Sequence, residues 1–266
     1  MWVGLIGLSL LAIVILNFSG DAVPGDRFDG TVSYFILGLF SVGVMWWLRP
    51  ATFAYFALPA FRWRFVIAFI FMVNLIVVQI RGEDFSGLTT EKWIRGIIFL
   101  ILVAVAEEIF SRGIVFGVLL RHGLMVAVIG SSLLFGLMHI NSYIGNFDAW
   151  PAYWHVMSAA SFGVFACALM VLTRSIWMPI VLHAFSNAGL LLTSAEDVKA
   201  ERDSVSSVPF LQGLIHPLPA FATFVIPSLI MFWIAAGMPL HLRLRQLAIK
   251  WKLIEPAEEQ LPVQES

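Results

Sequence analysis

The segment Ile97–Leu120 reads IIFLILVAVAEEIFSRGIVFGVLL and is apolar except near its middle. A helix needs about 20 mostly apolar residues to cross the hydrocarbon core of a bilayer, so this segment is long enough to span a membrane. Three charged residues interrupt it, namely Glu107, Glu108 and Arg112. A charge at the centre of a membrane helix costs roughly 2.5–3.5 kcal/mol, so such residues are functional candidates by default. The segment therefore predicts a membrane helix that carries a polar site.

The composition of the whole chain agrees with a membrane protein. Of the 266 residues, 60% are hydrophobic and 12% are charged, and the mean hydropathy is +0.90. A soluble domain has about 25% charged residues and a disordered chain is polar, so both classes are excluded. The net charge of -1 gives no polybasic signature of a nucleic-acid binder. The single cysteine, Cys167, excludes an intrachain disulfide and a Cys-based zinc finger.

We expect a multi-pass, all-α integral membrane protein with about eight transmembrane helices. The expected spans are Trp2–Phe18, Val32–Leu48, Phe65–Ile80, Ile97–Leu120, Met125–Ile140, Tyr153–Thr173, Ile176–Leu192 and Phe221–Leu240. A polar loop, Thr193–Ala220, precedes the last span. The chain then has three parts, which are the N-terminal helices without an assigned motif (1–96), a core with polar motifs (97–192), and the polar loop, last helix and basic tail (193–266).

The distribution of basic residues predicts the orientation in the membrane. The connections on one side carry Arg49, Arg62, Arg64, Arg121 and Arg174, and the C-terminal tail adds further basic residues. On the other side, basic residues are outnumbered by acids. By the positive-inside rule, both termini are therefore expected in the cytoplasm.

The spacing of the charged residues in the first quoted segment assigns them different roles. Glu108 and Arg112 are four residues apart on one helical face, with the acid before the base in the favourable order for an ion pair. Glu107 is rotated by about 100° from Glu108 and has no local cation. Such a carboxylate suits a general base, although a purely structural role for all three residues is the alternative. Gly113 and Gly117 are expected to allow close helix approach.

Two later spans carry histidines in similar patterns. His139 follows Phe135 by four residues and Asn187 follows His183 by four, so each pair shares a helical face. Imidazole and carboxamide groups can donate hydrogen bonds to the oxyanion that forms when a carbonyl is attacked. These residues and the glutamates could converge near the middle of the membrane. The remaining histidines fall at expected interfaces or in loops and receive no role: His122, His155, His216 and His241.

Three motifs in this order resemble those of a known family: Glu107-Glu108-x-x-x-Arg112, Phe135-x-x-x-His139 and His183-x-x-x-Asn187. The pattern is similar to the CPBP family of CAAX proteases and bacteriocin-processing intramembrane proteases. This family is also called the Abi family and is related to the Ras-converting CAAX endopeptidase. The resemblance covers about Ile97–Leu192, which makes this part the expected catalytic core.

The resemblance implies an intramembrane endopeptidase of a prokaryotic plasma membrane, acting on a membrane-associated protein or peptide. Glu107 would activate a water that attacks the scissile carbonyl, His139 would assist, and His183 and Asn187 would stabilise the oxyanion. Glu108 and Arg112 would be the supporting pair. Family members are described both as metalloproteases and as metal-free glutamate proteases.

The metal question stays open at this point. The chain has no His-Glu-x-x-His zinc motif, but Glu107 with His139 and His183 could hold a divalent metal such as zinc. We favour the metal-free mechanism.

Two other functions are also considered. A transporter or proton-coupled carrier could use Glu107, Glu108 and Arg112 as a relay, but the sequence has no evident inverted repeat or paired broken helices. A non-catalytic scaffold or immunity protein could bind a partner in the membrane, but every motif position is occupied. The sequence does not indicate a particular substrate.

Overall fold

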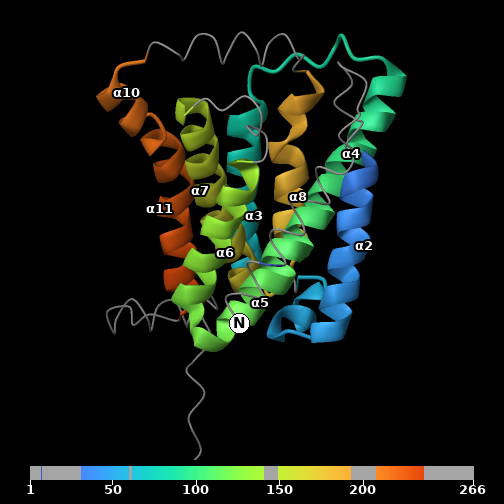
Figure 1. Cartoon of the computed structure of the whole chain (residues 1–266), viewed down its shortest axis with the longest axis vertical. Helices are drawn as coiled ribbons and strands as arrows, with labels where there is room; N and C mark the ends of the chain where they lie inside the picture. Colours follow the sequence, from blue (N-terminus) through green and yellow to red (C-terminus); the bar gives the residue numbers. More distant parts are fainter. Residues whose placement is uncertain (1–6, 8–30, 60–61, 141–148, 193–207, 237–266) are drawn as a thin grey trace, which may run out of the picture.

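The computed structural model describes residues 7, 31–59, 62–140, 149–192 and 208–236, and Figure 1 shows them as ribbons. Every regular element in this part of the chain is a helix, which confirms the all-α prediction. The helices run along one another, with connections at the two ends of the bundle (Figure 1). Three predicted features lie outside the described residues: the span Trp2–Phe18 apart from Gly7, residues 193–207 of the polar loop, and the basic tail.

Among the described residues, four helical segments are long and apolar enough to cross a membrane: α2 (Thr31–Leu48), α3 (Trp63–Ile80), α7 (Ala149–Thr173) and the pair α10–α11 within Phe210–Ala235. In this pair, α10 is Phe210–Ile215 and α11 is Leu218–Ala235. Two further apolar helices are shorter, α6 (Leu124–Met138) and α8 (Trp177–Ser186). The predicted count of eight spans is therefore not confirmed.

The predicted loop Thr193–Ala220 is wrong where α10 forms. The carbonyl oxygen of Gly213 accepts a hydrogen bond from Trp154 Nε1 at 2.7 Å, and that of Leu214 accepts one from the Tyr153 hydroxyl at 3.3 Å. Both donors belong to α7. The residues of α10 are themselves largely apolar (Phe210, Leu211, Leu214 and Ile215), so the predicted boundary of the polar loop lies too far toward the C-terminus.

The glutamates lie on one helical run whose winding changes along its length. The run begins with α4 (Thr90–Glu108), where the Thr89 side chain accepts a hydrogen bond from the Lys92 amide. Directly after Glu108 the winding becomes π-helical, and every residue of this stretch is buried. This π-helical stretch is η3 (Ile109–Val115). It is followed by α5 (Phe116–Leu119) and the 3-10 turn η4 (Leu120–His122). Single π-helical turns are rare and occur frequently at functional sites.

The oblique run from α4 to α5 packs against α2 and the short 3-10 helix η2 (Ala51–Phe56), as Figure 1 shows for the helices. The predicted close approach at two glycines is confirmed here. A Cβ atom on Gly117 would lie 2.4 Å from Thr52 Oγ1, and one on Gly113 would lie 3.0 Å from Met45 Sδ. On the other side, α7 packs against both α6 and α11. This packing brings the last turns of α4, α6 and α8 together.

Candidate active site

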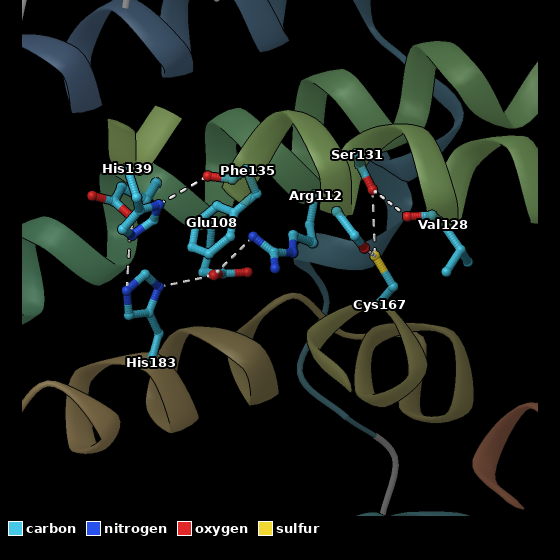
Figure 2. A network of polar contacts seen from close by, with 10 residues as sticks. Glu108, Arg112, Val128, Ser131, Phe135, His139, Cys167 and His183 are labelled. Carbon is cyan, nitrogen blue, oxygen red and sulfur yellow. Dashed lines mark hydrogen bonds and ion pairs between the residues drawn. The ribbon is translucent and has the colours of Figure 1, made fainter. Parts of the chain in front are cut away.

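The predicted polar side chains meet where α4, α6 and α8 end. Glu107 and Glu108 are the last residues of α4, and Arg112 lies in the π-helical stretch that follows. His139 comes directly after α6, and His183 lies in the last turn of α8. Figure 2 shows the labelled side chains of these helices directed toward one another.

Glu108 belongs to a paired half of the site. Its Oε1 atom accepts a hydrogen bond from His183 Nδ1 at 2.9 Å and lies 3.1 Å from Arg112 Nη1, and both contacts are drawn in Figure 2. The side chains of Glu108 and Arg112 are fully buried. The ion pair predicted from the spacing of these two residues is therefore confirmed.

Aromatic rings enclose the cation of this pair. The guanidinium carbon of Arg112 lies 4.3 Å from the centre of the Phe135 ring and 5.9 Å from that of Phe162. Its nitrogen atoms have no hydrogen-bond partner among the described residues. Charge attraction to Glu108 and cation–π contacts thus hold the guanidinium in place.

Glu107 belongs to an unpaired half of the site. Its Oε2 atom lies 3.8 Å from His183 Nε2 and 4.0 Å from His139 Nε2, distances too long for hydrogen bonds. This oxygen is buried and has no hydrogen-bond partner in the described part of the chain. The carboxyl group does have one polar neighbour from α2, because Tyr34 forms a side-chain hydrogen bond to it. The prediction that Glu107 has no cation of its own agrees with this arrangement.

The partners of the two histidines fix which ring nitrogen carries the proton. His139 Nδ1 lies 2.9 Å from the carbonyl oxygen of Phe135, an acceptor, so Nδ1 is the donor. His183 Nδ1 faces Glu108 at 2.9 Å in the same way, and Arg112 keeps that acid paired with a cation. In the neutral rings, both Nε2 atoms are therefore acceptors. Both of these acceptors are directed to the unpaired oxygen of Glu107.

A cavity of about 200 Å³ opens next to the histidines. His139, His183 and Asn187 line it, so the structure brings these three predicted residues to one space. Glu107 is not a lining residue, but its Oε2 atom lies 4.0 Å and 3.8 Å from the Nε2 atoms of the two lining histidines, His139 and His183. The other lining residues are mostly aromatic or small: Gln79, Phe135, His155, Ser158, Ala159, Phe162, Ser186 and Phe224.

Residues 89–189, which contain this site, match the family model described as "Type II CAAX prenyl endopeptidase Rce1-like". This segment is Rce1-like. No curated protein and no solved structure matches the chain. The match confirms the resemblance read from the three motifs, and it supports an intramembrane endopeptidase, a hydrolase with a peptide substrate, embedded in a lipid bilayer by its apolar helices.

The Rce1-like segment contains a polar residue that received no role from the sequence. His155 of α7 lines the cavity, and its ring packs edge-on against His139 with centroids 4.8 Å apart. The sequence pattern gave His155 no role, whereas the structure places it in α7 beside the cavity. The spacing of His155, Ser158, Ala159 and Phe162 follows one helical face, and this pattern could have linked His155 to the site.

Two polar residues outside the Rce1-like segment also contribute to the site, besides the lining residue Phe224. Tyr34 of α2 contacts Glu107, and Gln79 of α3 accepts a hydrogen bond from Ser186 Oγ at 2.7 Å. Gln79 thus joins two helices, as its position in an apolar span suggests. Neither contact has a spacing signal, because the partners lie far apart along the chain.

A metal was the open alternative for the Rce1-like site. In zinc sites of proteins, each ligand atom lies about 2.0–2.3 Å from the ion, and the ligands are arranged nearly tetrahedrally. Within the described ranges, no group of three or more His, Cys, Asp or Glu side chains is placed to hold a metal ion. The side chains in this arrangement therefore do not fit a zinc ion.

Proposed function

We propose that the protein is an intramembrane endopeptidase that hydrolyses a peptide bond of a membrane-associated protein or peptide, with Glu107 as the general base. One observation carries the proposal. A buried carboxylate oxygen without a hydrogen-bond partner lies about 4 Å from two imidazole nitrogens, both of which are acceptors. A water molecule between these three atoms would find acceptors for both of its protons and would direct its lone pair toward the cavity.

In the first step, the water oxygen attacks the scissile carbonyl carbon while one water proton passes to Glu107. The second water proton stays hydrogen-bonded to His139 Nε2, which keeps the nucleophile oriented. The carbonyl π electrons move onto its oxygen and form an oxyanion. When the tetrahedral intermediate collapses, the carbon–nitrogen bond breaks and Glu107 gives its proton to the departing amine. The products are a carboxylic acid and an amine, and the glutamate returns to its starting form.

His183 and Asn187 are proposed to stabilise the oxyanion. The Asn187 carboxamide can donate directly, since an amide nitrogen carries two protons. The neutral His183 ring keeps its proton on Nδ1, so Nε2 donates to the oxyanion only as the imidazolium that forms when it takes over the water proton from Glu107, 3.8 Å away; the proton returns to Glu107 before the amine departs. Glu108 favours that cation, as a carboxylate behind a histidine does in a catalytic triad. Glu108 is thus a positioning residue that acts through His183.

The proposal includes the finer points of location and mechanism. The enzyme works without a metal, resides in a prokaryotic plasma membrane and keeps both termini in the cytoplasm. The catalytic unit comprises residues 97–192, and residues 1–96 and 193–266 form its surroundings in the membrane.

Peptide-terminus mapping by mass spectrometry tests the activity. Cells would carry the wild type, Glu107→Gln or the control Glu91→Gln at matched protein levels. Glu91 suits as control because it is an exposed acid paired only with Arg95 across one helical turn. New peptide termini that occur with the wild type and the control but not with Glu107→Gln support the protease and identify its substrate. Identical termini in all three, under conditions of expression, contradict it and favour a carrier or scaffold.

A further inference from the structure

A second cavity, of about 960 Å³, lies at the opposite end of the bundle from the histidines. Two helices, α3 and α7, line both cavities. Gln79, near the end of α3, lines the histidine cavity, whereas Phe65 near its start lines the second one. Likewise, His155 and Thr173 lie at opposite ends of α7. The second cavity therefore belongs to a different site.

The charged residues around this second cavity are all arginines. Arg62, Arg64 and Arg174 line it, and no acidic side chain lines it among the described residues. Arg64 contacts the Trp63 ring with its guanidinium carbon 5.5 Å from the ring centre. Arg174 is exposed and has no hydrogen bond or ion pair in the described part of the chain. Arg64 and Arg174 thus place two positive charges at a cavity that has no acidic side chain among its described lining residues.

The walls of this cavity are held in place by contacts between segments far apart in sequence. Ile176 N donates to the carbonyl oxygen of Tyr55 at 2.8 Å, and Ser175 Oγ donates to that of Ala57 at 2.9 Å. Trp177 Nε1 donates a hydrogen bond to the carbonyl oxygen of Phe56 at 2.8 Å. These bonds join η2 to the connection between α7 and α8, so the arginine cavity is preformed.

The cavity lies at one end of each of two helices that are candidates to span the membrane. The span Trp63–Ile80 begins at it and the span Ala149–Thr173 ends at it. Apolar side chains line it beside the arginines, among them Leu58, Phe65 and Leu172. An amphiphile with an anionic head and an apolar tail complements both kinds of wall.

We propose that this cavity binds the phosphate group of an anionic phospholipid. Guanidinium groups match phosphate geometry with paired hydrogen bonds, and basic pockets between membrane helices bind lipid head groups. Free phosphate carries the same charged group, but it has no apolar part that could contact the apolar wall of the cavity. We therefore assign the cavity to the lipid. The proposal does not depend on proteolysis.

Lipid retention by the intact protein tests this proposal. The full chain would be placed in nanodiscs of phosphatidylcholine with a minor fraction of phosphatidylglycerol, and co-purifying lipid would be counted by native mass spectrometry. The cavity variant is Arg64→Gln/Arg174→Asn, since asparagine tolerates the left-handed backbone of Arg174 (φ 52°). The expected loss of retained phosphatidylglycerol is roughly tenfold or more.

The chain offers a closely matched control, Arg49→Asn/Arg121→Gln. Arg49 also has a left-handed backbone (φ 41°) and also contacts a tryptophan, Trp46, while neither it nor Arg121 lines the cavity. Retention within twofold of the wild type in this control supports the proposal. Equal loss in both variants indicates general charge attraction, and no loss in the cavity variant indicates an unused cavity; either result overturns the proposal.

Two further arms keep the test decisive. Displacement of the lipid by millimolar inorganic phosphate would assign the cavity to free phosphate and overturn the lipid proposal. If the double variant does not fold, the single variant Arg174→Asn replaces it, because the Arg174 side chain makes no hydrogen bond or ion pair among the described residues. About fivefold less retained phosphatidylglycerol is then expected.

Discussion

Glu107 and Glu108 are neighbours in the chain and both face His183, yet they belong to two halves of the site with different partners. Glu108 is paired with Arg112 and His183 and is fully buried. Glu107 has one oxygen with no hydrogen-bond partner, facing two imidazole nitrogens at about 4 Å. Each glutamate has one buried oxygen without a hydrogen-bond partner, Oε2, so the difference lies in the ion pair: Glu108 is held by Arg112, whereas Glu107 has no arginine or lysine paired with it among the described residues. In the proposed mechanism, the same residue type therefore takes opposite roles one position apart.

The largest expected effect is on catalysis in the unpaired half. Glu107→Gln should lower the cleavage rate by roughly 100- to 10,000-fold, the range for loss of a general base. Its free energy of unfolding should change by less than about 1 kcal/mol, because no ion pair is lost. Cleavage assays and denaturant unfolding of the purified protein measure the two quantities. A large loss of stability would place Glu107 in the structural half instead.

Substitutions in the paired half should mainly lower the free energy of unfolding. Glu108→Ala leaves Arg112 buried without its counter-charge, so the free energy of unfolding should fall by about 3–5 kcal/mol. The double variant Glu108→Ala/Arg112→Met removes both charges and should recover much of that loss. Its cleavage rate should stay low, because His183 is no longer positioned. A double variant no more stable than the single one would contradict the pairing argument.

The position of His139 depends on how closely α6 packs against α7. A Cβ atom on Gly136 would lie 2.6 Å from the Val156 carbonyl oxygen and 2.9 Å from Ala160 Cβ, so Gly136→Ala must push the helices apart. We expect a destabilisation of about 1–3 kcal/mol and a lower cleavage rate, since His139 follows three residues later. Gly43→Ala is the control, because its Cβ would meet nothing within 4 Å. Equal unfolding free energies for both variants would contradict this packing argument.

A smaller effect is expected from the tyrosine that contacts the unpaired half. Tyr34→Phe removes the side-chain hydrogen bond to Glu107 and should change the cleavage rate by up to about tenfold. Tyr153→Phe is the control, since its hydroxyl bonds a backbone carbonyl of α10 instead. If the two variants behave alike in the cleavage assay, Tyr34 has no specific role beside Glu107.

The smallest effect should follow from metal removal. The described residues hold no cluster placed for a metal ion, and the proposed water lies between Glu107 and the histidines. Dialysis against a chelator should leave the cleavage rate within about twofold. A loss that added zinc restores would assign the unpaired carboxylate and both Nε2 atoms to a metal.

Local patterns were sufficient for much of this protein. Hydropathy over windows of one span gave the all-α fold and the approximate bounds of the described helices. The spacing of Glu108 and Arg112 gave their ion pair, and the spacing of the glycines gave close helix contact. These predictions hold because helical periodicity relates residues within one or two turns. The count of spans did not follow, since short and interrupted helices have weak hydropathy signals.

The tertiary structure decided what each polar group contacts. The bond between His183 and Glu108 joins residues 75 positions apart, and the proton positions on both histidines follow from such contacts. Tyr34 and His155 enter the site through packing of α2 and α7, and the three arginines of the second cavity come from separate connections. The sequence by itself determined which polar residues lie within apolar helices. Only packing decided which of them are paired, because partners on different helices have no fixed spacing along the chain.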